Sequence, residues 1–260
     1  LLNLSNGEHI VKLLCTRSLS DLCLALITKK GTIKRVQASS FAKIRQTGIR
    51  AISLNDGDEL AFCVLTSGSD SLIVATKKGM VIRFMEKEVR VMGRQASGVR
   101  AIRLGSGDEV IGVQVVQPDH DILFVTEKGY GKRVKSTRFR IAHRGGMGVR
   151  AIPTAGRNGN AVGMASLSEE CDIILIDRAG KLIRLSPKEI RVLRRQAKGV
   201  RLIRLDDSQL LSCVAAFNFE DESEEAINRK KRPEESEKVE LDGPDELEKS
   251  RENIDTEDDK

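Results

Sequence analysis

Short hydrophobic runs recur along the first 219 residues at a spacing of about 50 residues. Each run has four to six residues rich in Ile, Val and Leu, which is typical of a strand buried on both faces. No segment keeps the helical apolar spacing of about 3.6 residues over roughly ten residues. The pattern therefore predicts strands at Leu22–Ile27, Leu72–Ala75, Ile122–Val125 and Ile173–Ile176.

Each run ends at a glycine that closes a tight turn, and a second strand follows the turn. Glycine adopts the positive φ that a tight hairpin needs. Four residues after each of these glycines stands an arginine, namely Arg35, Arg83, Arg133 or Arg184. The turns are Lys29-Lys30-Gly31, Lys77-Lys78-Gly79, Glu127-Lys128-Gly129 and Arg178-Ala179-Gly180.

A basic element with a glycine follows in each repeat and makes the period explicit. The shared glycines Gly48, Gly98, Gly148 and Gly199 are 50, 50 and 51 residues apart. Each copy has an arginine two residues after the glycine: Arg50, Arg100, Arg150 and Arg201. A second arginine precedes the glycine by three or four residues: Arg45, Arg94, Arg144 and Arg195.

A third strand after the glycine and a fourth after a polar turn complete each repeat. Four short strands in about 50 residues are typical of a propeller blade. We expect one four-stranded antiparallel blade from each full unit and a partial blade from residues 1–16, in an all-β fold. The full units are 22–66, 71–116, 121–167 and 172–216.

The charge of the chain is divided between a basic body and an acidic tail. Residues 220–260 contain 18 acidic and 8 basic residues, whereas residues 1–219 contain 36 basic and 20 acidic residues. The tail has too few apolar residues to offset the entropy of ordering, so we expect it to be disordered. A basic body indicates a polyanionic partner, for which a tethered acidic tail competes.

Repeated cations in a blade architecture recur at equal angular steps and form curved rows. Such rows match the phosphates of duplex DNA, and releasing counterions gives salt-sensitive affinity without sequence preference. Only 3% of the residues are aromatic, which disfavours single-strand binding by base stacking. The candidate DNA-binding residues are Lys30, Arg35, Arg45, Lys78, Arg83, Arg94, Lys128, Lys132, Arg133, Arg144, Arg178, Lys181, Arg184 and Arg195.

Two structural alternatives stay open for these cations. An arginine repeated in every blade can pair with a repeated acid, such as Asp58 or Asp108, and hold the blades together. This alternative applies especially to Arg50 and its counterparts, which lie close to a predicted buried strand. Lysines at hairpin tips can instead block unwanted strand pairing.

The sequence indicates no catalytic or metal-binding site. The three histidines are far apart, and no phosphate-binding loop or nucleophile motif occurs. The five cysteines form no C-x-x-C pair and are expected to be reduced core residues. Tyr130, the only tyrosine, is interpreted as a turn residue. No apolar run is long enough for a membrane span, and the chain, which starts inside a repeat, is interpreted as a fragment.

Residues 89–104 (VRVMGRQASGVRAIRL), residues 127–133 (EKGYGKR) and the period together resemble the C-terminal domain of the DNA gyrase A protein. The resemblance covers roughly residues 1–219. It implies a β-pinwheel, a propeller-like disc that wraps double-stranded DNA around a basic edge. It also implies a bacterial cytoplasmic enzyme in which the rest of the gyrase A protein and the gyrase B protein are partners. Negative supercoiling would use ATP and Mg bound outside this chain, which itself needs no cofactor.

The chain departs from the family pattern in two respects. Its four full repeats and one partial repeat are fewer than the six blades that the family implies. The family's Gln-Arg-Arg-Gly-Gly-Arg/Lys-Gly box is absent, and its nearest counterpart is His143-Arg144-Gly145-Gly146-Met147-Gly148. The alternatives are the equivalent domain of topoisomerase IV and a propeller that docks other proteins.

Overall fold

The structure, a computed structural model, describes residues 4, 7–43, 48–206 and 208–218. In the unit Leu1–Phe219, the described residues form β-strands and short 3-10 turns and contain no α-helix. The expected all-β class is therefore confirmed. The acidic tail 220–260, which was expected to be disordered, and Arg45 lie outside the described residues.

Each of the four full units contributes three antiparallel strands to one sheet. The first of the three is the predicted hydrophobic run, and the glycine turn joins it to the second. The strands of the first two units are β1 (Cys23–Thr28), β2 (Thr32–Gln37), β3 (Leu60–Thr66), β4 (Ser71–Thr76), β5 (Met80–Met85) and β7 (Val110–Val115). Those of the last two units are β8 (Asp121–Thr126), β9 (Tyr130–Lys135), β11 (Ala161–Leu167), β12 (Cys171–Asp177), β13 (Leu182–Leu185) and β15 (Leu211–Asn218).

The fourth strand of a sheet comes from the following repeat, so the expectation of one complete blade per unit is wrong. The short strand after the repeated glycine leaves its own unit and pairs with the second strand of the preceding sheet. The resulting sheet orders are β3-β1-β2-β6, β10-β5-β4-β7 and β11-β8-β9-β14. The exchanged strands are β6 (Val99–Arg100), β10 (Val149–Arg150) and β14 (Val200–Arg201).

The repeated glycines permit this exchange because the backbones approach closely. A Cβ at Gly148, whose φ is +73°, would lie 2.2 Å from the carbonyl oxygen of Val81 in the preceding sheet. A Cβ at the hairpin glycine Gly79 would lie 2.1 Å from the carbonyl oxygen of Ile152. Both contacts exclude any side chain, so these glycines are needed where consecutive repeats join.

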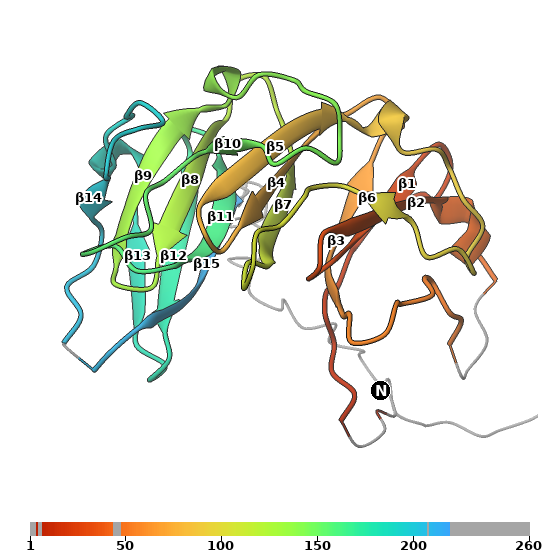
Figure 1. Ribbon diagram of the computed structural model, residues 1–260, viewed down its shortest axis with the longest axis horizontal. Coiled ribbons are helices and arrows are strands. Elements are labelled where there is room, and N and C mark those ends of the chain that lie inside the picture. The colour runs from red at the N-terminus through yellow and green to blue at the C-terminus, as the bar shows by residue number, and fades with distance from the viewer. Residues whose placement is uncertain (1–3, 5–6, 44–47, 207, 219–260) are drawn as a thin grey trace, which may run out of the picture. The chain divides into compact units, whose positions relative to one another are not determined.

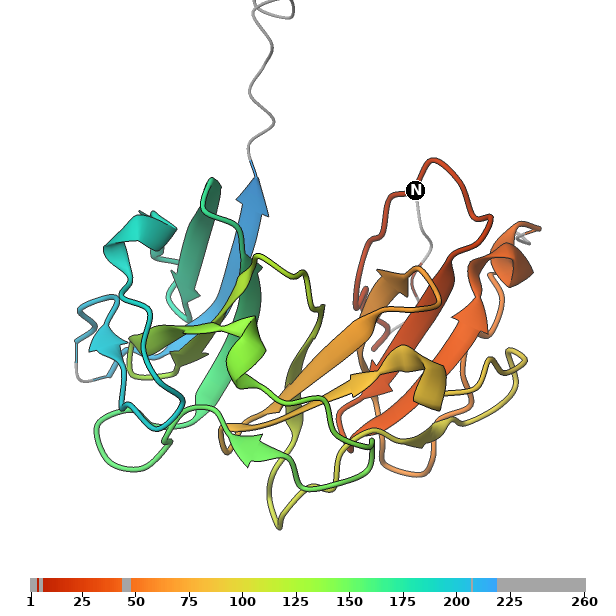
Figure 2. The same cartoon turned by 90° about the horizontal axis from the view of Figure 1, so that it is seen from above.

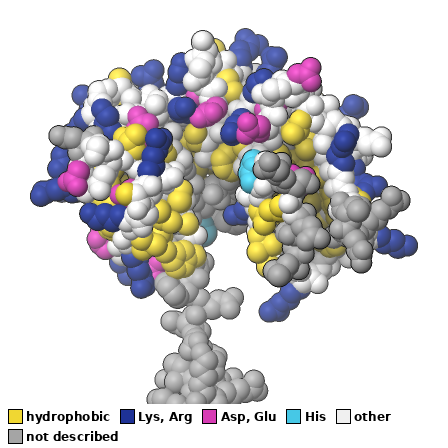
Figure 3. Space-filling model, turned by 90° about the horizontal axis from the view of Figure 1, so that it is seen from below, with side chains coloured by type: hydrophobic (Ala, Val, Ile, Leu, Met, Phe, Trp, Pro, Cys, Tyr) yellow, Lys and Arg dark blue, Asp and Glu magenta, His cyan; other side chains and the backbone are white. Residues whose placement is uncertain are grey.

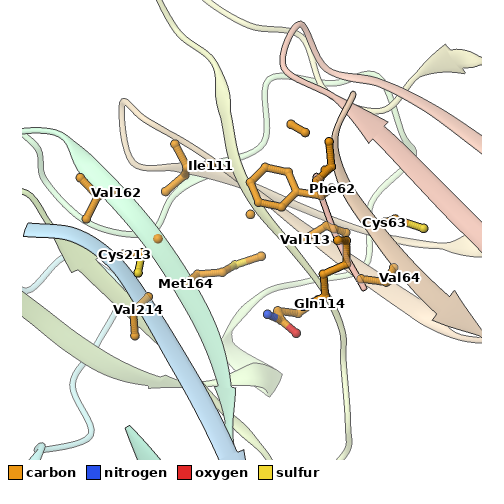
Figure 4. Close-up of a pocket in the computed structure, with 15 residues that line it drawn as sticks. Phe62, Cys63, Val64, Ile111, Val113, Gln114, Val162, Met164, Cys213 and Val214 are labelled. Atoms are coloured by element: carbon orange, nitrogen blue, oxygen red, sulfur yellow. The ribbon is translucent and has the colours of Figure 1, made fainter. Parts of the chain in front are cut away.

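The sheets follow one another in chain order around an arc (Figures 1 and 2). Each exchanged strand forms the outer edge of its sheet, opposite the strand on the inner side. The strands β3, β7, β11 and β15 lie on the inner side, where they line an open cavity of about 350 Å³. Phe62, Val113 and Met164 point into this cavity together with Gln114 (Figure 4). Most of the side chains that line the cavity are therefore apolar, although backbone groups, Lys12 and Gln114 add polar surface.

The hydrophobic core lies between neighbouring sheets. Ile27 of the first sheet and Phe84 of the second are both fully buried in one cluster. Phe124 belongs to the next cluster and packs edge-to-face on Phe139, with ring centroids 5.6 Å apart. Burial of apolar surface, the main favourable contribution to folding, therefore depends on having a second sheet beside the first.

The two ends of the arc are less complete. Residues 1–16, expected to be a partial blade, contain no strand among the described residues 4 and 7–16. The sheet β13-β12-β15 has three strands, and β13 has no exchanged strand beside it among the described residues. The burial of β12 alternates along the strand, so the prediction that every first strand is buried on both faces is wrong there.

Candidate nucleic-acid interface

In the first three units, the arginine four residues after the hairpin glycine joins one sheet to the next. Its guanidinium reaches the first residue of the 3-10 turn in the following unit. Arg35 pairs with Glu86 at 3.2 Å, and both side chains are almost fully buried. Arg83 donates to the carbonyl oxygen of Ser136, and Arg133 donates to that of Pro187. The turns that receive these contacts are η2 (Glu86–Glu88), η3 (Ser136–Arg138) and η4 (Pro187–Glu189); the fourth such turn is η1 (Ala38–Phe41).

This arrangement corrects the assignment of Arg35, Arg83 and Arg133 to a DNA-binding row. The structural alternative holds for them, although their partners differ from the expected Asp58 and Asp108. Those two carboxylates instead accept backbone N–H groups at the hairpin tips. Burial lowers the pKa of Arg83, whose guanidinium has exchanged water for protein carbonyl groups and a serine hydroxyl.

Lys132 is also removed from the candidate interface because its side chain is fully buried. Its ammonium group donates to the carbonyl oxygens of Arg194, Arg195 and Ala197, which belong to the basic element of the next repeat. Lys34 makes the same kind of contact with the carbonyl oxygens of Ala51 and Arg94. These lysines therefore position the basic loops and do not face solvent.

The lysines predicted at hairpin tips are exposed at those tips. Lys30 donates to the carbonyl oxygen of Asp56 at 3.1 Å, and Lys128 donates to that of Gly156 at 3.2 Å. Lys78 contacts the carbonyl oxygen of Ser106 in the same way. Their ammonium groups are thus held by backbone oxygens, and no ion pair with a carboxylate involves them among the described residues.

The exchanged strands place one arginine of each of the last three repeats at the outer edge. Arg100, Arg150 and Arg201 are exposed there, opposite Thr32, Met80 and Tyr130 of the preceding unit. No ion pair of these three arginines with a carboxylate is found among the described residues, which counts against the alternative that they pair with a repeated acid to hold the blades together; they were left out of the predicted DNA-binding set. A further exposed row, missed from the sequence although it shares the same spacing, consists of Arg90, Arg140 and Arg191.

The arginines that precede the repeated glycines differ among the repeats. Arg94 is exposed, whereas Arg144 and Arg195 are half-buried. Arg144 donates to the carbonyl oxygens of Glu88 and Arg100, which fixes the loop that resembles the family box. In that loop Met147 is 59% exposed, so the loop presents an apolar tip where the family box has a cation.

The last sheet carries the remaining predicted cations. Arg178 and Lys181 are exposed in the turn between β12 and β13. Arg184 forms an ion pair with Asp172 on the neighbouring strand, and its side chain remains 61% exposed. On the face shown in Figure 3, Lys and Arg side chains lie mainly along the outer margin, while hydrophobic side chains gather on the inner side.

The described residues include possible metal ligands and free cysteine thiols. They contain no cluster of three or more His, Cys, Asp or Glu side chains that could hold a metal ion. The five cysteines are free thiols; Cys15 and Cys213 are exposed, which corrects their expected place in the core. No helix among the described residues is long and apolar enough to cross a membrane.

Comparison with known proteins connects this geometry to a family. The family described as DNA gyrase C-terminal domain, beta-propeller matches residues 24–67, 70–117, 120–168 and 172–214. The DNA gyrase A protein of Halalkalibacterium halodurans is 51% identical over 223 residues, which cover 85% of this chain and 27% of that protein. The DNA gyrase A protein of Staphylococcus aureus is 36% identical over 86% of this chain and 26% of its own length.

Solved structures agree with this relationship. A DNA gyrase A C-terminal domain superposes with a TM-score of 0.75 at 28% identity, covering 83% of this chain and 72% of that one. The C-terminal domain of DNA topoisomerase IV shares the fold, with a TM-score of 0.79 at 22% identity over 87% and 72% of the two chains. The chain spans about a quarter of the length of the curated relatives. It belongs to the DNA gyrase C-terminal domain, beta-propeller family.

Proposed function

We propose that this chain binds duplex DNA along its outer edge and bends the duplex around the arc. The observation that carries the proposal is the row of exposed arginines on the exchanged strands, Arg100, Arg150 and Arg201. No ion pair with a carboxylate involves these three side chains among the described residues. Their charge is therefore available to phosphates, and the strand exchange repeats it at the outer edge of consecutive sheets.

The chemistry of this edge suits the DNA backbone better than the bases. Arginine presents a planar fork of donors that matches two phosphate oxygens. Contacts of this kind position a duplex without reading its sequence, and the accompanying counterion release makes affinity fall steeply with salt. An arc of such contacts favours bent DNA because more phosphates are reached as the duplex follows the curve.

We further propose that the chain acts as the C-terminal part of a gyrase A protein. Identities of 36–51% to gyrase A proteins favour this assignment over topoisomerase IV, with which the structural similarity extends only to the fold. In that setting the rest of the gyrase A protein and the gyrase B protein are the partners, and ATP and Mg are used outside this chain. The wrapped DNA segment would then assist negative supercoiling.

The first test measures duplex affinity as a function of salt for the natural chain and two triple variants. Arg100→Gln, Arg150→Gln and Arg201→Gln together remove the outer row. The matched variant combines Lys29→Gln, Lys77→Gln and Lys135→Gln and makes the same charge change; Lys29 and Lys77 already pair with Glu59 and Glu109. We expect the outer-row variant to lower the slope of log affinity against log salt by about 0.9 per lost phosphate contact.

The second test separates wrapping from binding. Relaxed circular DNA that is nicked and resealed in the presence of the chain should change its linking number, because wrapping constrains a superhelical turn. Binding without a linking change would contradict the wrapping part of the proposal. Equal salt slopes for the two triple variants would contradict the outer-edge assignment itself.

A further inference from the structure

The third sheet carries a cation-lined pocket at its outer edge, where an aromatic residue begins the second strand. Tyr130 begins β9 and lies opposite Arg201 of the exchanged strand β14. The strands β9 and β14 are neighbours in Figure 1. In the first two sheets, the position of Tyr130 is taken by Thr32 and Met80. The pocket has a volume of about 310 Å³, and its charged and aromatic lining residues are Lys128, Tyr130, Arg157, Arg201, Arg204 and Asp206.

Two guanidinium groups lie against the ring of Tyr130. The central carbon of Arg157 is 4.9 Å from the ring centroid, and that of Arg201 is 5.5 Å from it. The ring attracts each cation electrostatically, but the two cations repel one another. An anion that accepts hydrogen bonds from both guanidiniums would relieve this repulsion, and neither arginine pairs with a carboxylate among the described residues.

The pocket is held in shape by contacts behind it. Asn158 is fully buried and donates to the carbonyl oxygens of Pro153 and Lys198, at 2.7 and 2.8 Å. Arg157 donates to the carbonyl oxygen of Gly199 at 3.2 Å. These bonds tie the loop that carries Arg157 to the segment that leads into β14. A site whose donors are already positioned loses less entropy when a ligand binds.

The phenol of Tyr130 completes the set of donors. Arg201 donates to the phenol oxygen at 3.0 Å, so the hydroxyl keeps its own proton to donate to a ligand. This hydrogen bond and the nearby guanidiniums lower the pKa of Tyr130, which makes its hydroxyl a stronger donor. Lys128 and Arg204 add two more positive charges, against which Asp206 is the one acidic residue lining the pocket among the described residues.

We propose that this pocket binds a phosphodiester group of the duplex and anchors the DNA at the third sheet. Arg157 and Arg201 hold two phosphate oxygens, and the hydroxyl of Tyr130 donates to one of them. The inference rests on the proposed function and adds a fixed point to a surface that otherwise contacts DNA through similar repeated charges. Such a point would set the register of the duplex on the arc.

Tyr130 makes a selective measurement possible because the chain has one tyrosine and no tryptophan. The full chain produced with fluorotyrosine gives a single fluorine resonance in NMR, which reports only on this pocket. We expect saturating duplex at low salt to shift that resonance. In the Arg157→Gln, Arg201→Gln double variant the shift should be lost, even at duplex concentrations that saturate the variant.

Affinity supplies the second measurement, with a matched double variant elsewhere on the edge. Arg100→Gln with Arg103→Gln removes two exposed charges from the second repeat. Losing charge-assisted hydrogen bonds in the pocket should weaken duplex binding at least about tenfold. Removing the two matched surface charges should weaken it about fivefold at most. Thermal unfolding of each variant checks that its fold is retained.

The outcomes separate this inference from the proposed function. If the natural chain fails to bind duplex at low salt, the proposed function fails and the pocket has no DNA ligand. If the chain binds duplex but the fluorine resonance stays in place, the anchor is overturned while outer-edge binding stands. Equal losses of affinity in the two double variants would also overturn the anchor.

Discussion

The first three sheets and the last sheet are built from the same repeat but differ in completeness. Each of the first three receives an exchanged strand from the following repeat, whereas β13 has none beside it among the described residues. In a sheet that receives an exchanged strand, the first strand is buried on both faces, as β8 is. In the last sheet, the burial of the first strand, β12, alternates. Identical sequence signals therefore lead to different environments, depending on whether an exchanged strand lies beside the sheet.

The same contrast appears in the repeated arginines and glycines. Arg35 crosses to a buried carboxylate in the next unit, whereas Arg184 remains exposed. The ion pair of Arg184 with Asp172 lies within its own sheet, as does that of Arg133 with Asp121. A Cβ at Gly79 would collide with the backbone of the next repeat, but a Cβ at Gly180 would meet nothing within 4 Å among the described residues. The repeated residues thus join neighbouring units. Their counterparts in the last sheet, where these contacts are missing among the described residues, allow the effect of the junction to be measured by comparison.

The largest expected effect comes from the buried ion pair at the first junction. Glu86→Ala leaves the guanidinium of Arg35 buried without its carboxylate, and this should lower the free energy of unfolding by about 3–5 kcal/mol. Asp172→Ala breaks the exposed pair with Arg184 and should cost about 1 kcal/mol or less. Urea denaturation followed by circular dichroism measures both. Equal losses would show that the junction arginine does not depend on its partner.

The next effect compares two hairpin glycines with similar backbone angles. Gly79 has φ of +75° and Gly180 has φ of +86°. Substitution by alanine strains both positions by about 1–2 kcal/mol. Gly79→Ala should cost about 1–3 kcal/mol more, because its Cβ meets the carbonyl oxygen of Ile152. The measurement is the difference between the losses of unfolding free energy in Gly79→Ala and Gly180→Ala. A difference of zero would mean that the backbones of the two repeats move apart at Gly79 without a cost in free energy.

The smallest effect is the pH dependence of the free energy of unfolding, and it comes from the buried Lys132, which binds the basic loop of the next repeat. Burial, with a smaller contribution from Arg195, lowers the pKa of Lys132 to about 8. A lysine in the unfolded chain has a pKa of about 10.4, so the unfolded state binds more protons between these values. The contribution of Lys132 to the free energy of unfolding is therefore lowest below pH 8 and rises as the pH increases towards about 10.

Lys132→Met removes this titration without emptying the site. The unfolding free energy of the natural chain should gain about 1–3 kcal/mol relative to this variant between pH 8 and pH 10. Lys30→Met, at an exposed hairpin tip, serves as the control and should show no such gain. Parallel pH curves for the natural chain and Lys132→Met would contradict the lowered pKa.

Several features of this protein followed from the sequence alone. The hydrophobic runs, the glycine turns and the 50-residue period predicted the strands, because burial and turn geometry act over a few neighbouring residues. The hairpin-tip lysines were placed correctly for the same reason. The resemblance of the motifs to the gyrase A C-terminal domain led to the family that the comparisons confirm.

Other features were decided only by the tertiary structure. The periodicity of a repeat is the same whether its third strand stays in its own sheet or joins the preceding one, so Val99–Arg100 could not be assigned to the first sheet from sequence. For the same reason, Arg35 was wrongly predicted to lie at the surface, and the sequence did not decide whether Arg100 is exposed or pairs with an acidic residue. In one strand, Lys132 and Arg133, which also pairs with Asp121 of its own sheet, both donate to carbonyl oxygens that the next repeat supplies. Such partners lie more than 50 residues away in the chain, and only folding brings them within hydrogen-bond distance.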